Sequence, residues 1–333
     1  MALLRLIITL LSTISGCIQQ EKTSENNNTN NTFSINENST IYVGSAHADY
    51  NTIQEAINAA KNGATIIIKN GSYNELIVIN KTITLIGEDK NTTIINFNPN
   101  YEINRGPIIQ INADNCSIEN VQITVSNNSV IAQGISINSN NNTIKNNIIT
   151  EFEHGIELLR FTASNKILYN EIRNNTIGIY TIGSTTNNIS NNNIFSNTQY
   201  NIYLTTNSHK NNISFNIMSN SHYGIRIQGS QYNNVYKNYV HNNQIGLYPC
   251  CGTNLNYFYN NTLVNNSQNA QEKSGVINVW YDNQTGIGNY YDDYAGSDEN
   301  HDGIGDTPYE IPGAGNKDIY PLMTPPIDAP CNQ

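Results

Sequence analysis

Hydrophobic and polar positions in the middle of the chain repeat with a nearly constant spacing. A Gly-Ile pair or a close variant returns every 21 to 23 residues, at Gly134-Ile135, Gly155-Ile156, Gly178-Ile179, Asn201-Ile202, Gly224-Ile225 and Gly246-Leu247. Two aliphatic columns keep in step with it, at Ile144, Ile167, Ile189, Ile213 and Val235, and at Ile149, Ile172, Ile194, Met218, Val240 and Leu263. Three columns that share one period indicate a repeat architecture, in which each turn of the chain stacks on the turn before it.

The period also predicts what each turn contains. A turn of about 22–23 residues can hold three short strands, each paired with its counterpart in the next turn ~4.8 Å away. Asparagine recurs at one corner, at Asn147, Asn170, Asn192, Asn216, Asn238 and Asn261. Its side-chain amide can bond to the asparagines above and below, and it tolerates the left-handed backbone of a turn. A leucine-rich repeat shares the period but would show leucine columns and a helical half-turn. The sequence therefore predicts an all-β fold, a right-handed single-stranded parallel β-helix over residues 41–270.

The composition supports strands and excludes several other classes. Asn (63) and Ile (49) dominate the 333 residues, and only 13% of residues are charged. Few strong helix formers remain, which excludes a helical bundle or a helical repeat. The formal net charge is −10, so the backbone of a nucleic acid would be repelled, and we expect no nucleic-acid partner.

The first residues are typical of a secretory signal. Arg5 precedes the apolar run 6–14, which meets the small residues before Cys17. We interpret residues 1–16 as a signal peptide with a lipobox, which predicts cleavage before Cys17 and lipidation of its thiol; the alternative is an ordinary signal peptide cut nearby. Residues 17–40 are polar and are predicted to be a flexible linker. The mature chain is thus expected outside the cell, anchored by lipid to the outer face of the cytoplasmic membrane.

Both ends of the repeat carry recognisable motifs. After a start signal at Asp49 and Thr52, an amphipathic helix is predicted with Ile53, Ile57 and Ala60 on one face, where it would plug the open end of the coil. At the other end we expect a C-terminal cap over residues 271–323, followed by a tail over residues 324–333.

These end motifs and the repeats between them resemble the NosD-like branch of the pectate-lyase-like β-helix proteins. The resemblance covers residues 40 to 323. It is carried by the opening DYNTIQEAINAAKNGATIIIKNGSYNELIVINKTITLIGEDKNTTI and by the closing GNYYDDYAGSDENHDGIGDTPYEIP and DIYPL. Members of this group include periplasmic copper-site accessory proteins, archaeal surface proteins, and sugar-binding or sugar-cleaving relatives, so the resemblance implies a fold more firmly than an activity.

An acidic loop near the C-terminus matches the front of an EF-hand calcium loop. Oxygen ligands occupy relative positions 1, 3, 5 and 9, and Gly303 stands at position 6. The candidate Ca²⁺ ligands are the side chains of Asp298, Asn300, Asp302 and Asp306 and the backbone carbonyl of Ile304. Position 12 is Tyr309 where a full EF-hand has Glu. We predict a loop held together by Ca²⁺; the alternative is an acidic turn without an ion.

One outward column of the coil is a candidate carbohydrate surface. Two positions after each glycine mark stand Glu157, Tyr180, Tyr203, Arg226 and Tyr248. Strand alternation directs this column away from the core. Tyrosines spaced ~4.8 Å apart can stack against sugar rings; alternatively, tyrosine is simply a favourable residue on an exposed sheet.

Catalysis has few candidate residues. Glycosidases need two carboxylates that flank the scissile bond, yet residues 158–271 contain a single acidic residue, Glu171. The candidates are Glu151, Glu153, His154 and Glu157, with His154 as a base; a solvated charged edge is the alternative.

Copper is not expected, because copper sites need grouped His, Met or Cys. The four histidines of the repeats fall in different columns, at His154, His209, His222 and His241. The adjacent Cys250 and Cys251 could form a metal or redox pair, one of them could bond to Cys331, or both could be ordinary thiols.

The expected function is accordingly that of a lipid-anchored surface protein that binds a polysaccharide or another envelope glycan, or serves as an envelope scaffold. The alternatives are a polysaccharide lyase or glycoside hydrolase, and a copper-site accessory protein.

Overall fold

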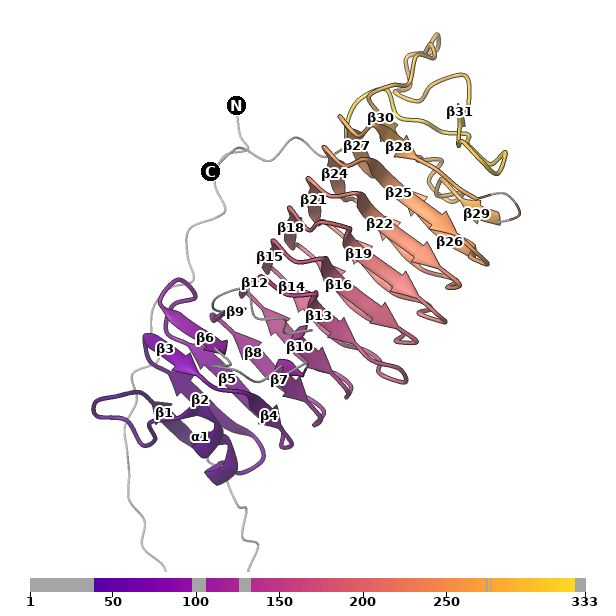
Figure 1. Ribbon diagram of the computed structural model, residues 1–333. Coiled ribbons are helices and arrows are strands. Elements are labelled where there is room, and N and C mark those ends of the chain that lie inside the picture. Colours follow the sequence, from indigo (N-terminus) through magenta and orange to yellow (C-terminus); the bar gives the residue numbers. More distant parts are fainter. Residues whose placement is uncertain (1–38, 98–105, 126–132, 274, 276, 327–333) are drawn as a thin grey trace, which may run out of the picture. The chain divides into compact units, whose positions relative to one another are not determined.

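The computed structural model describes residues 39–97, 106–125, 133–273, 275 and 277–326, and within them the chain winds through three parallel sheets (Figure 1). Each turn contributes one strand to each sheet in chain order. The first sheet contains β1 (Thr40–Val43), β2 (Ala64–Ile68), β5 (Ile83–Gly87), β8 (Ser117–Glu119), β11 (Thr143–Lys145), β14 (Lys166–Leu168), β17 (Asn188–Ser190), β20 (Asn212–Ser214), β23 (Asn234–Tyr236), β26 (Asn254–Tyr259) and β29 (Ile277–Val279). The second contains β3 (Gly71–Asn74), β6 (Thr93–Phe97), β9 (Gln122–Val125), β12 (Ile148–Thr150), β15 (Glu171–Arg173), β18 (Asn193–Phe195), β21 (Ile217–Ser219), β24 (Tyr239–His241), β27 (Thr262–Val264) and β30 (Tyr290–Tyr291). The third contains β4 (Ile77–Ile79), β7 (Pro107–Ile111), β10 (Gln133–Ile137), β13 (His154–Leu158), β16 (Ile177–Ile182), β19 (Tyr200–Thr205), β22 (Tyr223–Gln228), β25 (Ile245–Cys250) and β28 (Gln268–Ala270).

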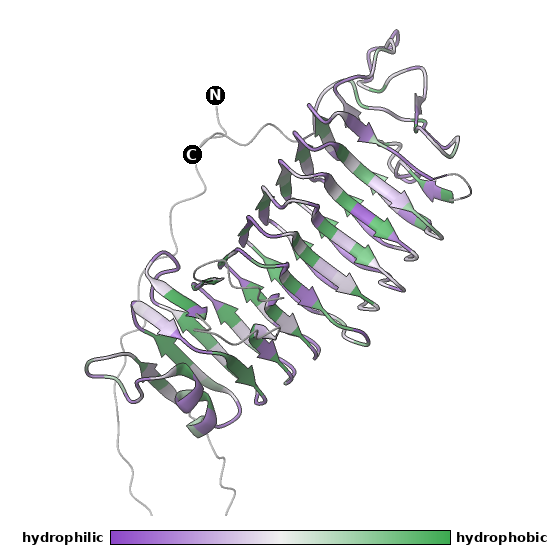
Figure 2. Cartoon of the chain, viewed as in Figure 1, coloured by the Kyte–Doolittle hydropathy of each residue, from purple (hydrophilic) through white to green (hydrophobic). Residues whose placement is uncertain are grey.

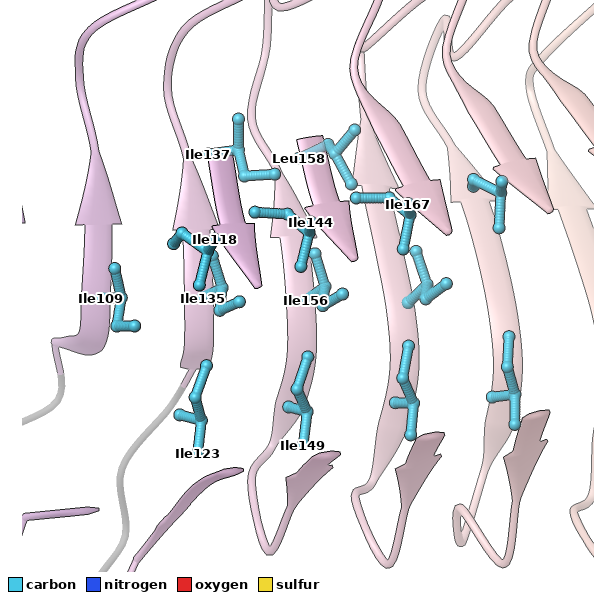
Figure 3. Packing of buried hydrophobic residues seen from close by; sticks show 14 of the residues in the cluster. Ile109, Ile118, Ile123, Ile135, Ile137, Ile144, Ile149, Ile156, Leu158 and Ile167 are labelled. Carbon is cyan, nitrogen blue, oxygen red and sulfur yellow. The ribbon is translucent and has the colours of Figure 1, made fainter. Parts of the chain in front are cut away.

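The register of the strands confirms the predicted right-handed parallel β-helix. Ile144 pairs with Ile167, and Ile167 pairs with Ile189 in the next turn. These side chains are fully buried. Figure 3 shows Ile144 and Ile167 within the columns of buried side chains that fill the interior of the coil. Hydrophobic residues concentrate along the strands and hydrophilic residues at the corners (Figure 2). Burial of stacked isoleucines is therefore the main source of stability, and parallel pairing satisfies the backbone between turns.

The predicted N-terminal helix is confirmed as α1 (Ile53–Ala59), which contacts β1, β2 and β4. The hydroxyl of Thr52 caps it by accepting a hydrogen bond from the Glu55 N–H at 3.3 Å. Ile53 and Ile57 are buried as expected, together with Ala56, whereas Ala60 is buried just beyond the last helical residue. No helix among the described residues is long and apolar enough to cross a membrane.

Asparagine side chains form hydrogen-bonded ladders at three corners of the coil. The sequence predicted such a ladder at one corner. The first ladder contains Asn142, Asn165, Asn187, Asn211, Asn233, Asn256 and Asn278. The second contains Asn147, Asn170, Asn192, Asn216, Asn238, Asn261 and Asn289. The third contains Asn175, Asn197, Asn243 and Asn266. In each ladder the side-chain oxygen accepts the backbone N–H of the preceding turn, so every step satisfies a buried amide.

Two of the ladders end on a carboxylate of the C-terminal cap, and the third reaches carboxylates through Asn269, which accepts from the last member, Asn266. Asn278 donates to Glu272 at 2.9 Å, and the backbone N–H of Asn289 donates to Asp318 at 2.7 Å. Beyond the third ladder, Asn269 donates to Asp292 and Asp293, both at 2.8 Å. A carboxylate accepts without donating, so it completes a chain of donors that all point toward the C-terminus. Two short antiparallel strands, β31 (Tyr309–Glu310) and β32 (Lys317–Asp318), complete this cap.

Residues 1–38 and 327–333 lie outside the described residues. They include the predicted signal peptide, Cys17, all but the last two residues of the predicted linker, and Cys331. The lipid anchor and the proposed limits of the linker and tail therefore stay predictions.

Candidate functional site

The predicted outward column forms one continuous row on the third sheet. Tyr180 pairs with Tyr203, Tyr203 with Arg226, and Arg226 with Tyr248. Glu157 precedes Tyr180 in the same row. The tyrosines and Arg226 are half-buried, whereas Glu157 is 9% exposed.

A second row of side chains joins the same face because strand alternation breaks at the glycine column. In β19 both Asn201 and Ile202 are buried, and Tyr200 comes to lie beside Tyr203 with ring centroids 4.7 Å apart. The break follows from close approach between turns: a Cβ on Gly178 would lie 2.6 Å from the carbonyl oxygen of Asn201. Strict alternation misses Tyr200 and Tyr223; a tyrosine directly before the glycine mark was the available signal.

The two rows build a surface that we call the aromatic belt. It consists of Tyr180, Tyr200, Tyr203, Tyr223 and Tyr248, with His154 at one end and Arg226 among the rings. Centroid distances along it are 4.5 Å for His154–Tyr180, 5.6 Å for Tyr180–Tyr203, 4.7 Å for Tyr203–Tyr200, 5.3 Å for Tyr200–Tyr223 and 5.4 Å for Tyr223–Tyr248. The last three pairs are stacked, which gives the belt large apolar ring faces with polar hydroxyl ends.

Arg226 is held among four of these rings. Its guanidinium carbon lies 5.3–5.9 Å from the ring centroids of Tyr200, Tyr203, Tyr223 and Tyr248, within the range of cation–π attraction. Nη1 donates to the Tyr200 hydroxyl at 2.8 Å, and Nη2 donates to the Gln228 side chain at 3.2 Å. Gln228 also accepts a hydrogen bond from the Tyr203 hydroxyl at 2.7 Å, so the cation and the rings hold one another in place.

Burial opposes ionisation of three of the belt tyrosines. It raises the pKa of Tyr180, Tyr223 and Tyr248 above the usual tyrosine value. For Arg226, burial acts to lower the pKa, but Coulombic attraction to the ionisable groups of Cys250, Tyr200 and Tyr203, together with a hydrogen bond to Cys250, raises the pKa overall. The belt is thus an aromatic surface with a cation held among its rings.

The catalytic candidates separate into a pair and two isolated residues. His154 Nδ1 lies 3.4 Å from Glu157 Oε1, and the Tyr180 ring lies against the imidazole at an interplanar angle of 33°. Glu151 lies at a corner with positive φ, where its carboxylate accepts from Thr150 and Asn174. Glu153 is exposed. The structure thus joins His154 and Glu157 to the acidic end of the belt, but it does not bring Glu151 to them.

The acidic loop folds around its own backbone. Asp298 accepts from the N–H groups of Asp302 at 3.2 Å and Gly303 at 2.9 Å, and Asp302 accepts from Ile304 at 2.8 Å. Asp306 accepts from the N–H of Glu299 at 2.7 Å. In the part of the chain that the structure describes, no three His, Cys, Asp or Glu side chains form a group that could hold a metal ion. Binding of Ca²⁺ to this loop remains a proposal.

The histidines have separate partners. His209 Nδ1 accepts from the Gln231 N–H at 2.9 Å, while His222 packs on Tyr223 and His241 on Tyr239. Burial lowers the pKa of His209 and His241. The described residues do not fit a copper site, because these side chains share no centre.

The cysteines of the described region are free thiols. Cys116 and Cys250 are buried, and Cys251 is exposed at a corner with φ of 58°. Burial raises the pKa of Cys250 to about 11, which leaves its thiol protonated at neutral pH.

Fold and belt together define a parallel β-helix protein with an aromatic surface on one sheet. A family model described as periplasmic copper-binding protein (NosD) matches residues 88–296, and the chain belongs to this family. No curated protein sequence matches the chain significantly.

Solved structures that resemble the chain share its fold. Pectate lyase Pel9A is 13% identical with a TM-score of 0.53, over 73% of this chain and 79% of that one. The alginate lyase from Paenibacillus sp. str. FPU-7 is 14% identical with a TM-score of 0.48, over 73% of this chain and 97% of that one. At 13% identity, the likeness to pectate lyase Pel9A shows the β-helix fold alone.

Proposed function

We propose that this chain is a glycan-binding protein of the cell envelope and that it holds carbohydrate on the aromatic belt. The observation that supports the proposal is the unbroken contact of five tyrosine rings across the four turns β16, β19, β22 and β25. Sugar rings present flat C–H faces that pack on aromatic rings, and the tyrosine hydroxyls can bond to sugar hydroxyls.

The arrangement of the belt favours binding of a polysaccharide over binding of a single small molecule. The rings follow the stacking direction of the turns, so neighbouring tyrosines offer successive contacts to successive sugar residues. An enzymatic role is not needed to explain this row, whereas a bare scaffold has no need for stacked rings around a half-buried cation.

Two further features belong to the proposal. Cys17 would carry lipid and tether the β-helix to the outer face of the membrane, where envelope glycans lie. Ca²⁺ bound at Asp298, Asn300, Asp302, Ile304 and Asp306 would neutralise the acidic loop of the cap.

A glycan screen tests the proposal and separates it from its alternatives. The purified chain is incubated with an array of polysaccharides and oligosaccharides, and both retention and products are measured. Retention without cleavage is expected. Absence of binding to every glycan would contradict it and favour a scaffold, whereas shortened or unsaturated products would make the chain a hydrolase or a lyase.

A further inference from the structure

Arg226 is a half-buried cation without an acidic partner. Two other cations do form ion pairs: Arg173 lies 2.6 Å from Glu171, and Lys317 lies 2.6 Å from Glu310. No ion pair to Arg226 is found among the described residues, and its Nε is buried without a hydrogen-bond partner. A cation removed from water without a counter-ion is unfavourable unless an anion compensates it.

The contacts of Arg226 leave its charge available. The guanidinium donates to the neutral oxygens of Tyr200 and Gln228, and it also contacts the Cys250 thiol, whose pKa burial raises to about 11 and which therefore carries no charge at neutral pH. The rings around the guanidinium hold it in place without neutralising it. A guanidinium fixed in this way is prepared for a planar or tetrahedral anion, because little side-chain entropy is lost when the anion binds.

The distribution of charge along the chain points to the same ligand chemistry. Residues 158–271, which include the whole belt from Tyr180 to Tyr248, contain six Lys and Arg and one acidic residue, a net charge of +5. The complete chain has a net charge of −10. Most acidic residues therefore lie before residue 158, including Glu157 at the start of the row, or after residue 271, and the stretch between them, which holds Arg226, attracts anions.

We propose that Arg226 is a specificity-determining residue that selects glycans with an anionic group, a carboxylate or a sulfate ester, on a sugar stacked on the belt. This inference rests on the proposed function, and it adds the chemical class of the ligand. The anion accepts hydrogen bonds from the guanidinium while the sugar ring packs on Tyr203 or Tyr248, the tyrosines on either side of Arg226 in the row.

Matched pairs of ligands test it. Oligomers of galacturonic, glucuronic and mannuronic acid are compared with their carboxyl-reduced, neutral counterparts, and a sulfated oligosaccharide forms a third arm. Wild-type chain should bind at least one acidic form about tenfold more tightly than its neutral counterpart, and the preference should weaken as salt is added. The carboxylate and sulfate arms identify which anion is taken.

Variants assign the preference to Arg226. In Arg226→Gln the acidic and neutral forms should bind equally, and Arg226→Lys should keep only part of the preference because it lacks the planar fork. Lys237→Gln is the control, since it removes one positive charge from the same turn, between β23 and β24, where Lys237 lies over Phe215 outside the belt. It should keep the wild-type preference. Melting curves establish that each variant is folded. The salt dependence of the preference is measured on the wild type and tests the proposal even if a variant fails to fold.

The outcomes separate the two proposals. Equal binding of acidic and neutral oligomers by the wild type would overturn the selection of anions and leave glycan binding intact. Equal loss of both in Arg226→Gln would reduce Arg226 to a support for the tyrosines and would also overturn it. Binding of neither form of any oligomer would overturn both proposals.

Discussion

Asn201 fills the gap that Ser221 leaves in the third asparagine ladder. Ser221 stands where the neighbouring turns have Asn197 and Asn243. The side chain of Asn201 accepts from Asn197 Nδ2 at 2.9 Å and donates to Asn243 Oδ1 at 3.3 Å. Asn201 itself stands in the column that otherwise carries glycine in the adjoining turns, so an exception in one column compensates for an exception in another.

Replacement of Asn201 by Gly should therefore destabilise the coil, and a second replacement should restore it. Asn201→Gly removes buried hydrogen bonds and leaves the Asn197 amide short of an acceptor, which costs about 1–3 kcal/mol. Ser221→Asn alone should also destabilise, because it adds an amide to space that Asn201 fills. The double variant reproduces the glycine-and-asparagine pattern of the adjoining turns and should approach wild-type stability.

Denaturant unfolding of the four proteins measures this coupling as a double-mutant cycle. The control is the same cycle with Asn212→Gly and Asn234→Gly. These two asparagines share a single side-chain hydrogen bond, and Asn212 is exposed. If the effects of Asn201→Gly and Ser221→Asn on the free energy of unfolding simply add, Asn201 does not compensate for Ser221.

The aromatic belt predicts which tyrosines bind a glycan. Tyr180→Ala with Tyr203→Ala should weaken binding by about 1–3 kcal/mol, since two stacking surfaces are lost. Tyr236→Ala with Tyr259→Ala is the control, because these rings stack at 5.3 Å on the first sheet, away from the belt. Titration calorimetry should show reduced affinity in the first pair alone, and equal affinity in the two pairs would place the glycan elsewhere.

The sequence predicted the fold well because the aliphatic columns are purely periodic. The inward position of Ile144, Ile167 and Ile189 follows from spacing alone, and the register reproduces it. The three-residue step from Tyr200 to Tyr203 did not follow, because alternation assumes a regular strand, and contact between turns at the glycine column breaks that regularity.

The ends of the ladders were equally hidden from the sequence. Glu272 and Asp318 are isolated acidic residues in a cap without a period, and only folding brings them to Asn278 and Asn289. The predicted row from Tyr180 to Tyr248 was found because it shares the period of the coil, whereas the cap residues share none.

The carboxyl group of Asp318 predicts a pH dependence of stability. Burial raises its pKa to about 7, although hydrogen bonds from Asn289, Tyr320 and Tyr291 act to lower it. The unfolded group has the ordinary value of 3.8, so the folded chain binds the proton more tightly. The free energy of unfolding should be highest below pH 4 and fall as the pH rises to about 7, by at most about 4 kcal/mol from this group.

Melting curves between pH 4 and 8 check this dependence. Asp318→Asn should be less stable over this whole pH range, because its amide would face the Tyr320 N–H, from which Asp318 accepts a hydrogen bond. It should nevertheless show a flatter slope between pH 4 and 7. Glu272, whose pKa burial also raises, adds a dependence of the same sign that the variant retains. A slope as steep as that of the wild type would contradict the assignment to Asp318.

The acidic loop predicts that Ca²⁺ stabilises the C-terminal cap. Asp298, Asp302 and Asp306 bring three negative charges into one turn, and they repel one another unless a cation neutralises them. Extracellular calcium modules bind with Kd of roughly 10⁻⁴–10⁻³ M. A hundredfold excess of Ca²⁺ over Kd would stabilise the folded cap by about 2.7 kcal/mol.

Calorimetry should show a higher melting temperature in Ca²⁺ than in chelator. Asp302→Ala should abolish the difference, whereas Glu299→Ala, which removes a charge from the same loop without removing a proposed ligand, should preserve it. Identical traces of the wild type with and without Ca²⁺ would make the loop an acidic turn whose carboxylates serve only its own backbone N–H groups.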